Sequence, residues 1–154
     1  MKTRLCGVLT VILLTSGCVH TVHLYPVQGP LSRQAPPPVL IAKVTGALTP
    51  GSVSVALPEK EVCKGQWANV RQTGGAAAAG ARTGTDLASA WDVVYGPGFY
   101  VSHVLGERYY VRAVASCSHG NTLSLEMYTP VGGGAGIKGV AKDDAGNIFK
   151  LAFP

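Results

Sequence analysis

The sequence predicts an all-β domain with one short helix, folded as a small antiparallel β-barrel or β-sandwich of about seven or eight strands. Three observations lead to this fold class. Only 14% of the residues are charged and 20 are glycine. Several stretches alternate apolar and polar residues with a period of two, and Gly, Pro, Asn and Asp separate these stretches. Closure into a barrel or a sandwich would protect the strand edges from further pairing.

The first 17 residues predict a secretory signal peptide. Lys2 and Arg4 precede the uncharged segment Leu5–Gly17, and a basic start followed by a short apolar core is typical of such leaders. A helix needs about 20 apolar residues to cross a bilayer, so this segment is too short to be a transmembrane helix. Cys6 would be discarded with the leader.

The leader ends in the sequence LTSGC, Leu14–Cys18, which resembles the lipobox of bacterial lipoproteins. Thr15 departs from the pattern, because leucine is commonest at that position. The resemblance implies a diacylglycerol on the Cys18 thiol, cleavage before Cys18 and acylation of the new amino group, which together make a lasting membrane anchor. Val19 follows the cysteine in place of Asp, and this implies sorting to the outer membrane, facing the periplasm. No narrower functional family is identified.

Residues 18–38 predict a lipidated, Pro-rich tether, which leaves residues 39–154 as a single β-rich domain. The triplet Pro36-Pro37-Pro38 favours extended polyproline II structure, which makes a stiff spacer. An alternative stays open, because several residues here are too apolar for a pure spacer and would dock on the domain or on a partner. They are His23, Leu24, Tyr25 and Val27.

The rest of the chain predicts strands, with one helix over Asp86–Tyr95 that Gly96-Pro97 terminates. Thr85 or Asp86 would cap its start, and residues 74–84 are expected to form a loop. The expected strands are Val39–Thr45, Ser52–Leu57, Val62–Arg71, Gly98–Leu105, Arg108–Cys117, Thr122–Thr129, 137–143 and 148–153.

Two cysteines remain in the predicted domain, Cys63 and Cys117. Two thiols in an exported protein are expected to pair as a disulfide. The bridge would close a loop of about 55 residues, which corresponds to a stabilisation on the order of 4 kcal/mol in the chain-entropy model. Cys63 and Trp67 share a strand face, so the disulfide and an aromatic side chain are expected together in the core.

A cluster of aromatic and basic residues between positions 95 and 112 predicts a partner-binding surface. Tyr and Arg are frequent anchors of interfaces, and core packing is the alternative for the same residues. The candidate residues are Tyr100, Arg108, Tyr110 and Arg112. The cations are scattered along the chain, so nucleic acid is not expected as a partner.

Catalytic and metal sites are not predicted, and no cofactor is expected. His20 and His23 lack the further ligands that a metal site needs. A triad of Asp92, His103 and Ser102 or Ser116 would lack a GxSxG-type nucleophile elbow. Asp143 and Asp144 fall in an expected hairpin turn, where Asp bonds the local backbone.

The predicted function is therefore that of a membrane-anchored envelope lipoprotein, a non-catalytic structural or binding module with an envelope protein or a glycan as its partner. The alternatives are an envelope hydrolase, or a carrier of a small ligand or a metal. A hydrolase predicts that Asp92, His103 and a serine converge, and a carrier predicts a roomy interior.

Overall fold

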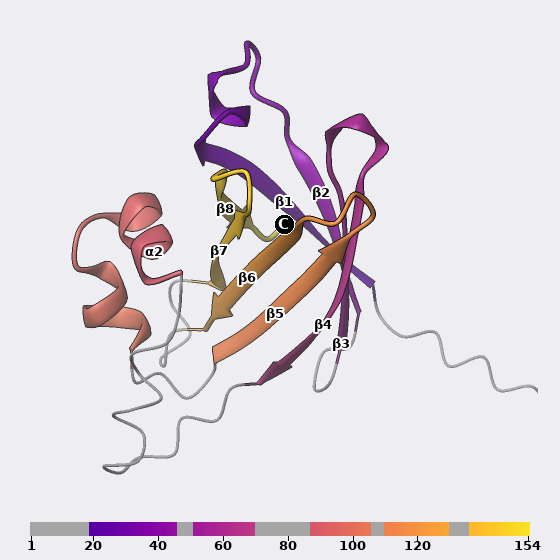
Figure 1. Cartoon of the computed structure of the whole chain (residues 1–154). Helices are drawn as coiled ribbons and strands as arrows, with labels where there is room; N and C mark the ends of the chain where they lie inside the picture. The colour runs from indigo at the N-terminus through magenta and orange to yellow at the C-terminus, as the bar shows by residue number, and fades with distance from the viewer. Residues whose placement is uncertain (1–18, 46–50, 70–86, 106–109, 130–135) are drawn as a thin grey trace, which may run out of the picture.

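The computed structural model of the chain describes residues 19–45, 51–69, 87–105, 110–129 and 136–154. Eight antiparallel strands close into a barrel in which each strand pairs with the next and the last pairs with the first (Figure 1). The strands are β1 (Val19–Gln28), β2 (Leu40–Thr45), β3 (Gly51–Ala56), β4 (Val62–Asn69), β5 (Tyr110–Cys117), β6 (Thr122–Tyr128), β7 (Lys138–Asp143) and β8 (Ile148–Ala152). The helical segments are η1 (Leu31–Arg33), η2 (Pro58–Lys60), α2 (Ala88–Tyr95) and η3 (Tyr100–Val104).

Alternation along the strands fills the interior of the barrel. In β3, Val53 and Val55 are buried while Ser52 and Ala56 are exposed, as expected where one sheet face is packed and the other meets water. The same alternation around the barrel produces one apolar cluster. Its buried members are Val22, Leu24, Leu40, Ala42, Val53, Val55, Cys63, Trp67, Ala113, Ala115, Cys117, Leu123, Leu125, Met127, Ala141, Phe149 and Leu151.

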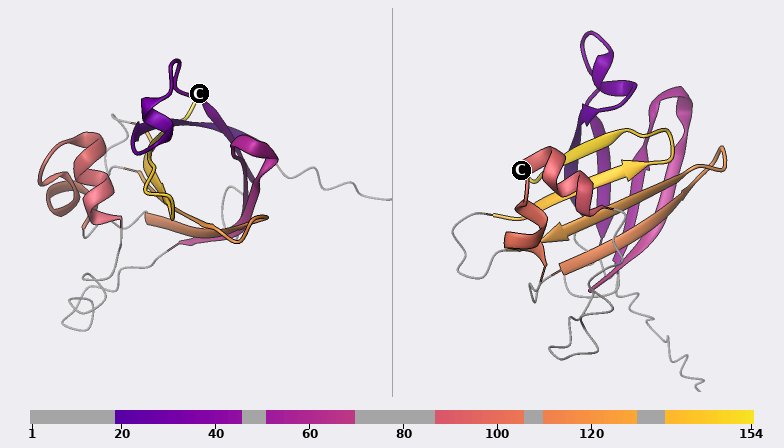
Figure 2. Two further views of the ribbon diagram at one scale, coloured as in Figure 1. Left: turned by 45° about the horizontal axis from the view of Figure 1, so that its top comes forward. Right: turned by 60° about the vertical axis from the view of Figure 1, so that its left-hand side comes forward.

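A second apolar cluster lies outside the barrel wall, where α2 and η3 cover β6, β7 and β8 (Figure 2, left). Trp91 of α2 and Tyr100 of η3 meet Tyr128, Val140 and Ile148 there. Strand β6 is buried on both faces near its end as a result, with the burial pattern iBiBBBB. The helix therefore stabilises the fold, because it covers the apolar outer face of these strands and removes it from water.

The predicted barrel-or-sandwich class is confirmed, and closure makes it a barrel. Strands appear at or within a few residues of seven predicted positions, as β2 to β8. The predicted helix corresponds to α2, whereas Thr85, Asp86 and residues 74–84 lie outside the described residues. Cys63 and Trp67 are both buried in the interior cluster as predicted.

The strand predicted over Gly98–Leu105 is wrong. Tyr100–Val104 forms a single π-helical turn instead, close behind α2. The apolar residues of this segment fit a helical spacing as well as an alternating one, since Tyr100 and Val104 are four residues apart and both buried. The carboxylate of Asp92 accepts a hydrogen bond from the Tyr100 backbone N–H at 2.9 Å, which favours the helical path over a hairpin.

The tether predicted over residues 18–38 is also corrected. Residues 19–28 form β1, which bonds to β2 on one side and to β8 on the other and so closes the barrel. Val22 and Leu24 point into the core and are almost completely buried. The folded domain thus includes residues 19–38 as well as the predicted 39–154, because the barrel needs this strand to bury its last two edges. Cys18 lies outside the described residues.

The barrel has two different ends. At one end, which we call the turn end, lie the connections 29–39, 57–61, 118–121 and 144–147. Val19 lies at the opposite end, where its register partner is Thr45, the last residue of β2. Any group attached immediately before Val19 is therefore far from the turn end.

Candidate functional site

A disulfide joins Cys63 of β4 to Cys117 of β5, as the sequence predicts. The two residues are direct register partners at the turn-end limit of these strands. Both are buried in the interior cluster. The bridge therefore covalently fixes the pairing of two strands that are separated in sequence by 54 residues.

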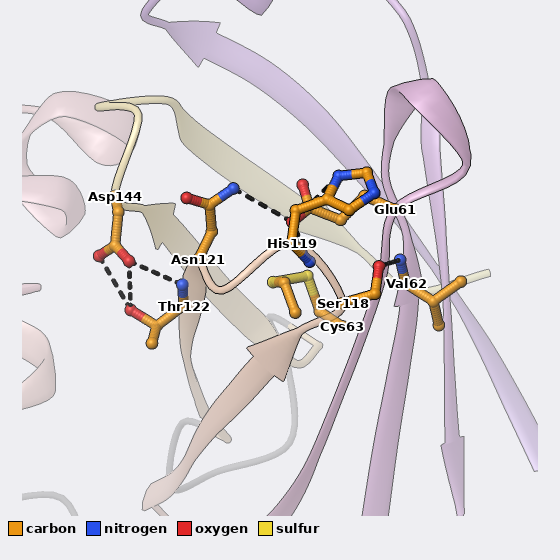
Figure 3. A network of polar contacts seen from close by, with 9 residues as sticks. Glu61, Val62, Cys63, Ser118, His119, Asn121, Thr122 and Asp144 are labelled. Atoms are coloured by element: carbon orange, nitrogen blue, oxygen red, sulfur yellow. Dashed lines mark hydrogen bonds and ion pairs between the residues drawn. A yellow bond between two sulfur atoms is a disulfide. The ribbon is translucent and has the colours of Figure 1, made fainter.

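Polar side chains beside the disulfide connect neighbouring turns at the turn end (Figure 3). Glu61 is 8% exposed, and its Oε1 accepts hydrogen bonds from the His119 backbone N–H at 3.3 Å and from Asn121 Nδ2 at 3.1 Å. The His119 ring nitrogen Nδ1 lies 3.9 Å from the same oxygen. Ser118 adds two bonds to Val62, one through its hydroxyl and one through its backbone N–H. These contacts tie the β3–β4 turn to the β5–β6 turn.

Asp144 connects the next pair of turns. Its carboxylate accepts hydrogen bonds from the Thr122 backbone N–H at 2.7 Å and from the Thr122 hydroxyl at 2.8 Å (Figure 3). The neighbouring Asp143 accepts from the backbone and side-chain N–H groups of Asn147. The predicted local backbone bond is confirmed for Asp143, which accepts from the Asn147 N–H of its own turn. Asp144 instead bonds Thr122 at the neighbouring turn.

Asn147 completes the connections by holding η1. Its Oδ1 accepts the Leu31 backbone N–H at 2.8 Å. Asn147 is 3% exposed, and its Nδ2 donates to Asp143, so both the oxygen and the nitrogen of its amide are hydrogen-bonded. Each of the four connections at this end is thereby bonded to a neighbour, and we call these bonded turns the cap.

The second polar site lies between α2 and the barrel wall. Glu126 of β6 is fully buried, and its Oε2 accepts a hydrogen bond from Trp91 Nε1 at 2.8 Å. The Arg112 guanidinium of β5 lies 3.9 Å from Oε1. A buried carboxylate is costly without such partners, and these contacts connect the helix to two strands of the barrel.

Stacked aromatic rings extend from this site along α2 and η3. Tyr95 stacks on Phe99 with centroids 4.8 Å apart, and Phe99 stacks on His103 at 4.5 Å. Trp91 stacks on Tyr95 and meets Tyr128 edge to face, both at 5.6 Å. Trp91 and Tyr95 share one side of α2 because they are four residues apart. The chain turns at Gly96, where α2 ends, and η3 then brings Phe99 and His103 into line with the Tyr95 ring.

Tyr95, like Trp91, contacts the strands of the barrel wall. Burial raises the pKa of its phenol, although a hydrogen bond with the Gly139 backbone opposes the shift. Two ammonium groups lie near the ring, Lys138 Nζ at 5.3 Å and Lys150 Nζ at 5.7 Å from its centroid. Cation–π attraction at these distances adds to the packing of α2 on β7 and β8.

The structure describes the side chains of two of the four residues in the predicted partner-binding surface, Tyr100 and Arg112. Tyr100 is buried against Trp91's cluster, and Arg112 is half-buried beside Glu126. Arg108 and the side chain of Tyr110 lie outside what the structure describes. The core-packing alternative therefore holds for Tyr100, whose aromatic neighbours in sequence turned out to be helical.

Asp92, His103 and Ser116, three residues of the possible catalytic triad, each contact different groups. Asp92 bonds the Tyr100 backbone, and His103 is stacked on Phe99 with its side chain exposed. Ser116 lies on β5, opposite Lys64 and Thr122. No hydrogen bond joins Asp92, His103 and a serine among the residues described in the structure, so the convergence that a hydrolase predicts is not found there.

His20 and His23 lie on β1, where His23 meets Tyr25 edge to face at 6.3 Å. Within residues 19–45, 51–69, 87–105, 110–129 and 136–154, no group of three or more His, Cys, Asp or Glu side chains is placed to hold a metal ion. In the same ranges no helix has the length and apolar character needed to span a membrane.

An exposed apolar surface on β1 and β2 was not assigned from the sequence. We call it the β1–β2 face. The apolar character of residues 23–27 is the sequence signal for this surface. Which of these side chains point outward becomes known only once the strand and its register are known. Its residues are Val19, His23, Tyr25, Val27, Val39 and Ile41.

No family model, curated protein or solved structure matches this chain. The described features define a class of structure: a small, disulfide-bonded, eight-stranded closed barrel with one helix on its wall.

Proposed function

We propose that the protein is a lipid-anchored lipoprotein of the bacterial envelope whose barrel serves as a non-catalytic structural or binding module. The observation that carries the proposal is that Val19, the residue after the lipobox cysteine, is already part of β1 and pairs with Thr45 of β2. A lipid on Cys18 would therefore be attached directly beside a strand of the barrel. The lipid on Cys18 would hold the domain at a membrane, and Val19 after the cysteine supports the outer membrane, facing the periplasm.

The architecture supports a rigid module over the alternatives. The interior is packed with large side chains such as Trp67, Met127 and Phe149, which counts against a carrier with a roomy barrel. The disulfide and the bonded turns stiffen one end. A hydrolase finds less support, because Asp92 and His103 are engaged with other groups.

The outer surface of α2 and η3 is our proposed contact for an envelope protein or a glycan. Val93 and Val101 are exposed there, Val101 by 65%, and the exposed His103 ring stacks on Phe99. π-Helical turns such as η3 occur frequently at functional sites. Exposed aliphatic groups beside a stacked aromatic column offer an apolar contact of the kind that partners bury.

The anchor is tested by replacing Cys18 with serine and labelling cells with radioactive palmitate. We expect Cys18→Ser to abolish labelling and to prevent cleavage after Gly17, because the thiol is the only site for the diacylglycerol. The matched control is Cys6→Ser, which changes the other cysteine of the leader and should leave labelling intact. Retained palmitate in Cys18→Ser, or a mature protein whose mass shows no acyl chains, would refute the anchor.

The contact surface is tested by affinity purification from detergent extracts of cross-linked envelopes. Val101→Asp should lower the amount of cross-linked partner recovered at least tenfold relative to Val114→Asp, because burying an unpaired charge in an interface is strongly unfavourable. A tenfold loss corresponds to about 1.4 kcal/mol of binding free energy. Val114 is a suitable control because it is a 52% exposed valine on β5. Equal recovery with both variants would remove the α2–η3 surface from the proposal.

A further inference from the structure

We propose that the β1–β2 face lies on the bilayer surface beside the lipidated Cys18, so that the barrel is held on its side against the membrane. The proposal rests on the anchor argued above and adds the orientation of the domain and a second membrane contact. The occupant of the face is the lipid surface itself. An upright barrel would instead leave this apolar face in water.

The β1–β2 face gathers many of the exposed apolar side chains. Of the large hydrophobic side chains that are exposed among the described residues, half belong to it: Val19, Tyr25, Val27, Val39 and Ile41. Their exposed fractions run from 41% to 57%. Contiguous exposed apolar surface of this kind marks a contact with a partner or a membrane.

The residues of the face are neighbours across two strands. His23 of β1 is the register partner of Ile41 of β2, and the His23 and Tyr25 rings are in edge-to-face contact. The strand alternation that sends Val22 and Leu24 into the core sends His23 and Tyr25 outward. The face therefore follows β1 along its length and widens onto β2.

Charge favours a lipid surface as the occupant. Strands β1, β2, β3 and β8 contain no Asp or Glu, whereas one exposed lysine lies within the span of the face, level with Thr21 between Val19 and His23, and another lies beside it on β8. Lys43 pairs with Thr21, and Lys150 pairs with Tyr25. Basic residues near a bilayer are attracted to anionic lipids, and a tyrosine with an apolar ring and a polar hydroxyl suits the headgroup region.

The position of the anchor selects the bilayer over a protein partner. The face starts at Val19, directly after Cys18, and β1 is ten residues long, or about 34 Å at the usual rise per residue. With no spacer between the acyl chains and the strand, β1 starts at the lipid. The rest of the same strand then meets lipid at a high effective concentration.

The test measures quenching of an introduced tryptophan by brominated lipid. The full acylated protein, carrying Tyr25→Trp, is reconstituted into vesicles of phosphatidylethanolamine and phosphatidylglycerol that contain phosphatidylcholine brominated near the headgroup end of its acyl chains. The matched control is Val114→Trp on β5. Strands β1 and β5 are on opposite sides of the closed barrel (Figure 2, left), and the native Trp67 and Trp91 are buried and common to both variants.

We expect the tryptophan at position 25 to be quenched several-fold more than the one at position 114, because an interfacial apolar face sits roughly 5–10 Å deep at the headgroup–acyl boundary. Equal quenching, or an unquenched position 25 in protein that still floats with the vesicles, would overturn the side-on orientation while leaving the anchor intact. Protein that carries no acyl chains by mass and does not float would overturn the anchor and this proposal together.

Discussion

Single residues hold α2 to the barrel through contacts of different kinds. Trp91 contributes both a buried ring and an N–H that satisfies Glu126. Tyr95 contributes a phenol that shares a hydrogen bond with the Gly139 backbone. Each of these side chains has an apolar body and one polar atom, so it can bury area without leaving a buried polar group unpaired.

The raised pKa of Tyr95 leads to a prediction about alkaline stability. The unfolded tyrosine ionises near 10.0, whereas the folded phenol holds its proton to higher pH. The folded state then binds more protons than the unfolded state, so the free energy of unfolding is at its full value below pH 10 and falls as the pH rises through the folded pKa. Tyr95→Phe should make this decline shallower, measured by urea denaturation between about pH 8 and 11.

The control for this measurement is Tyr25→Phe, because that side chain is exposed on the β1–β2 face. It should retain the decline of the wild-type protein. An identical pH dependence in Tyr95→Phe and the wild type would show that the burial of this phenol is not linked to folding. Lys138 and Lys150 remain beside the ring in both variants.

Among the elements, β1 has the largest consequence for the rest of the molecule. It supplies both the strand that closes the barrel and most of the β1–β2 face. Its inward residues and its outward residues therefore serve different purposes. The bulge between Pro26 and Gln28 accommodates proline next to β8, consistent with the preference of proline for irregular positions in sheets.

Because inward and outward residues of β1 have different roles, replacing them with alanine should have unequal effects on stability. Leu24→Ala should lower the free energy of unfolding by about 2–5 kcal/mol, because it leaves a cavity where a fully buried leucine packs. Tyr25→Ala, one position along the same strand, removes a larger but 41% exposed side chain and should cost much less. Urea denaturation of the two variants gives the comparison, and equal small losses would mean that residues 19–28 are a tether after all.

The α2–η3 segment shows a second way in which an element depends on its context. Its residues cover Tyr128, Val140 and Ile148, which point outward from the barrel. Without the helical segment, these three apolar side chains on the outer face of β6 to β8 would be exposed to water. The helix is the reason that those strands can carry apolar residues on both faces.

At the scale of the whole molecule, the two ends and the two sides of the barrel differ. The turn end is capped by bonded turns and the disulfide, and the opposite end carries Val19. One side is covered by α2 and η3, and a neighbouring side exposes the β1–β2 face (Figures 1 and 2). A lipid at Cys18 would orient the barrel relative to the membrane. The β1–β2 face would then contact the membrane, and the α2–η3 surface would be available to a partner.

Several features of this protein were predictable from the sequence alone, because local patterns carry them. Period-two alternation gave β2, β3, β6 and β8 nearly to the residue, and the spacing of Leu87, Ala90 and Trp91 indicated α2. The pairing of Cys63 with Cys117 followed by sorting the four cysteines. The lipobox is likewise a local motif, and its lipid stays a prediction.

The tertiary structure alone decided what depends on closure. A proline-rich segment with a few apolar residues is equally compatible with a tether and a strand, and β1 is selected because β2 and β8 both offer an edge to it. Helical and alternating spacings agree over residues 98–105, and contacts with Asp92 and Trp91 resolve them. Which side chains remain exposed on β1 and β2 is likewise a property of the closed barrel, because exposure depends on residues far apart in the chain. The sequence by itself thus determined the fold class, the disulfide and most strands, and long-range packing determined the domain boundary and the surfaces available for function.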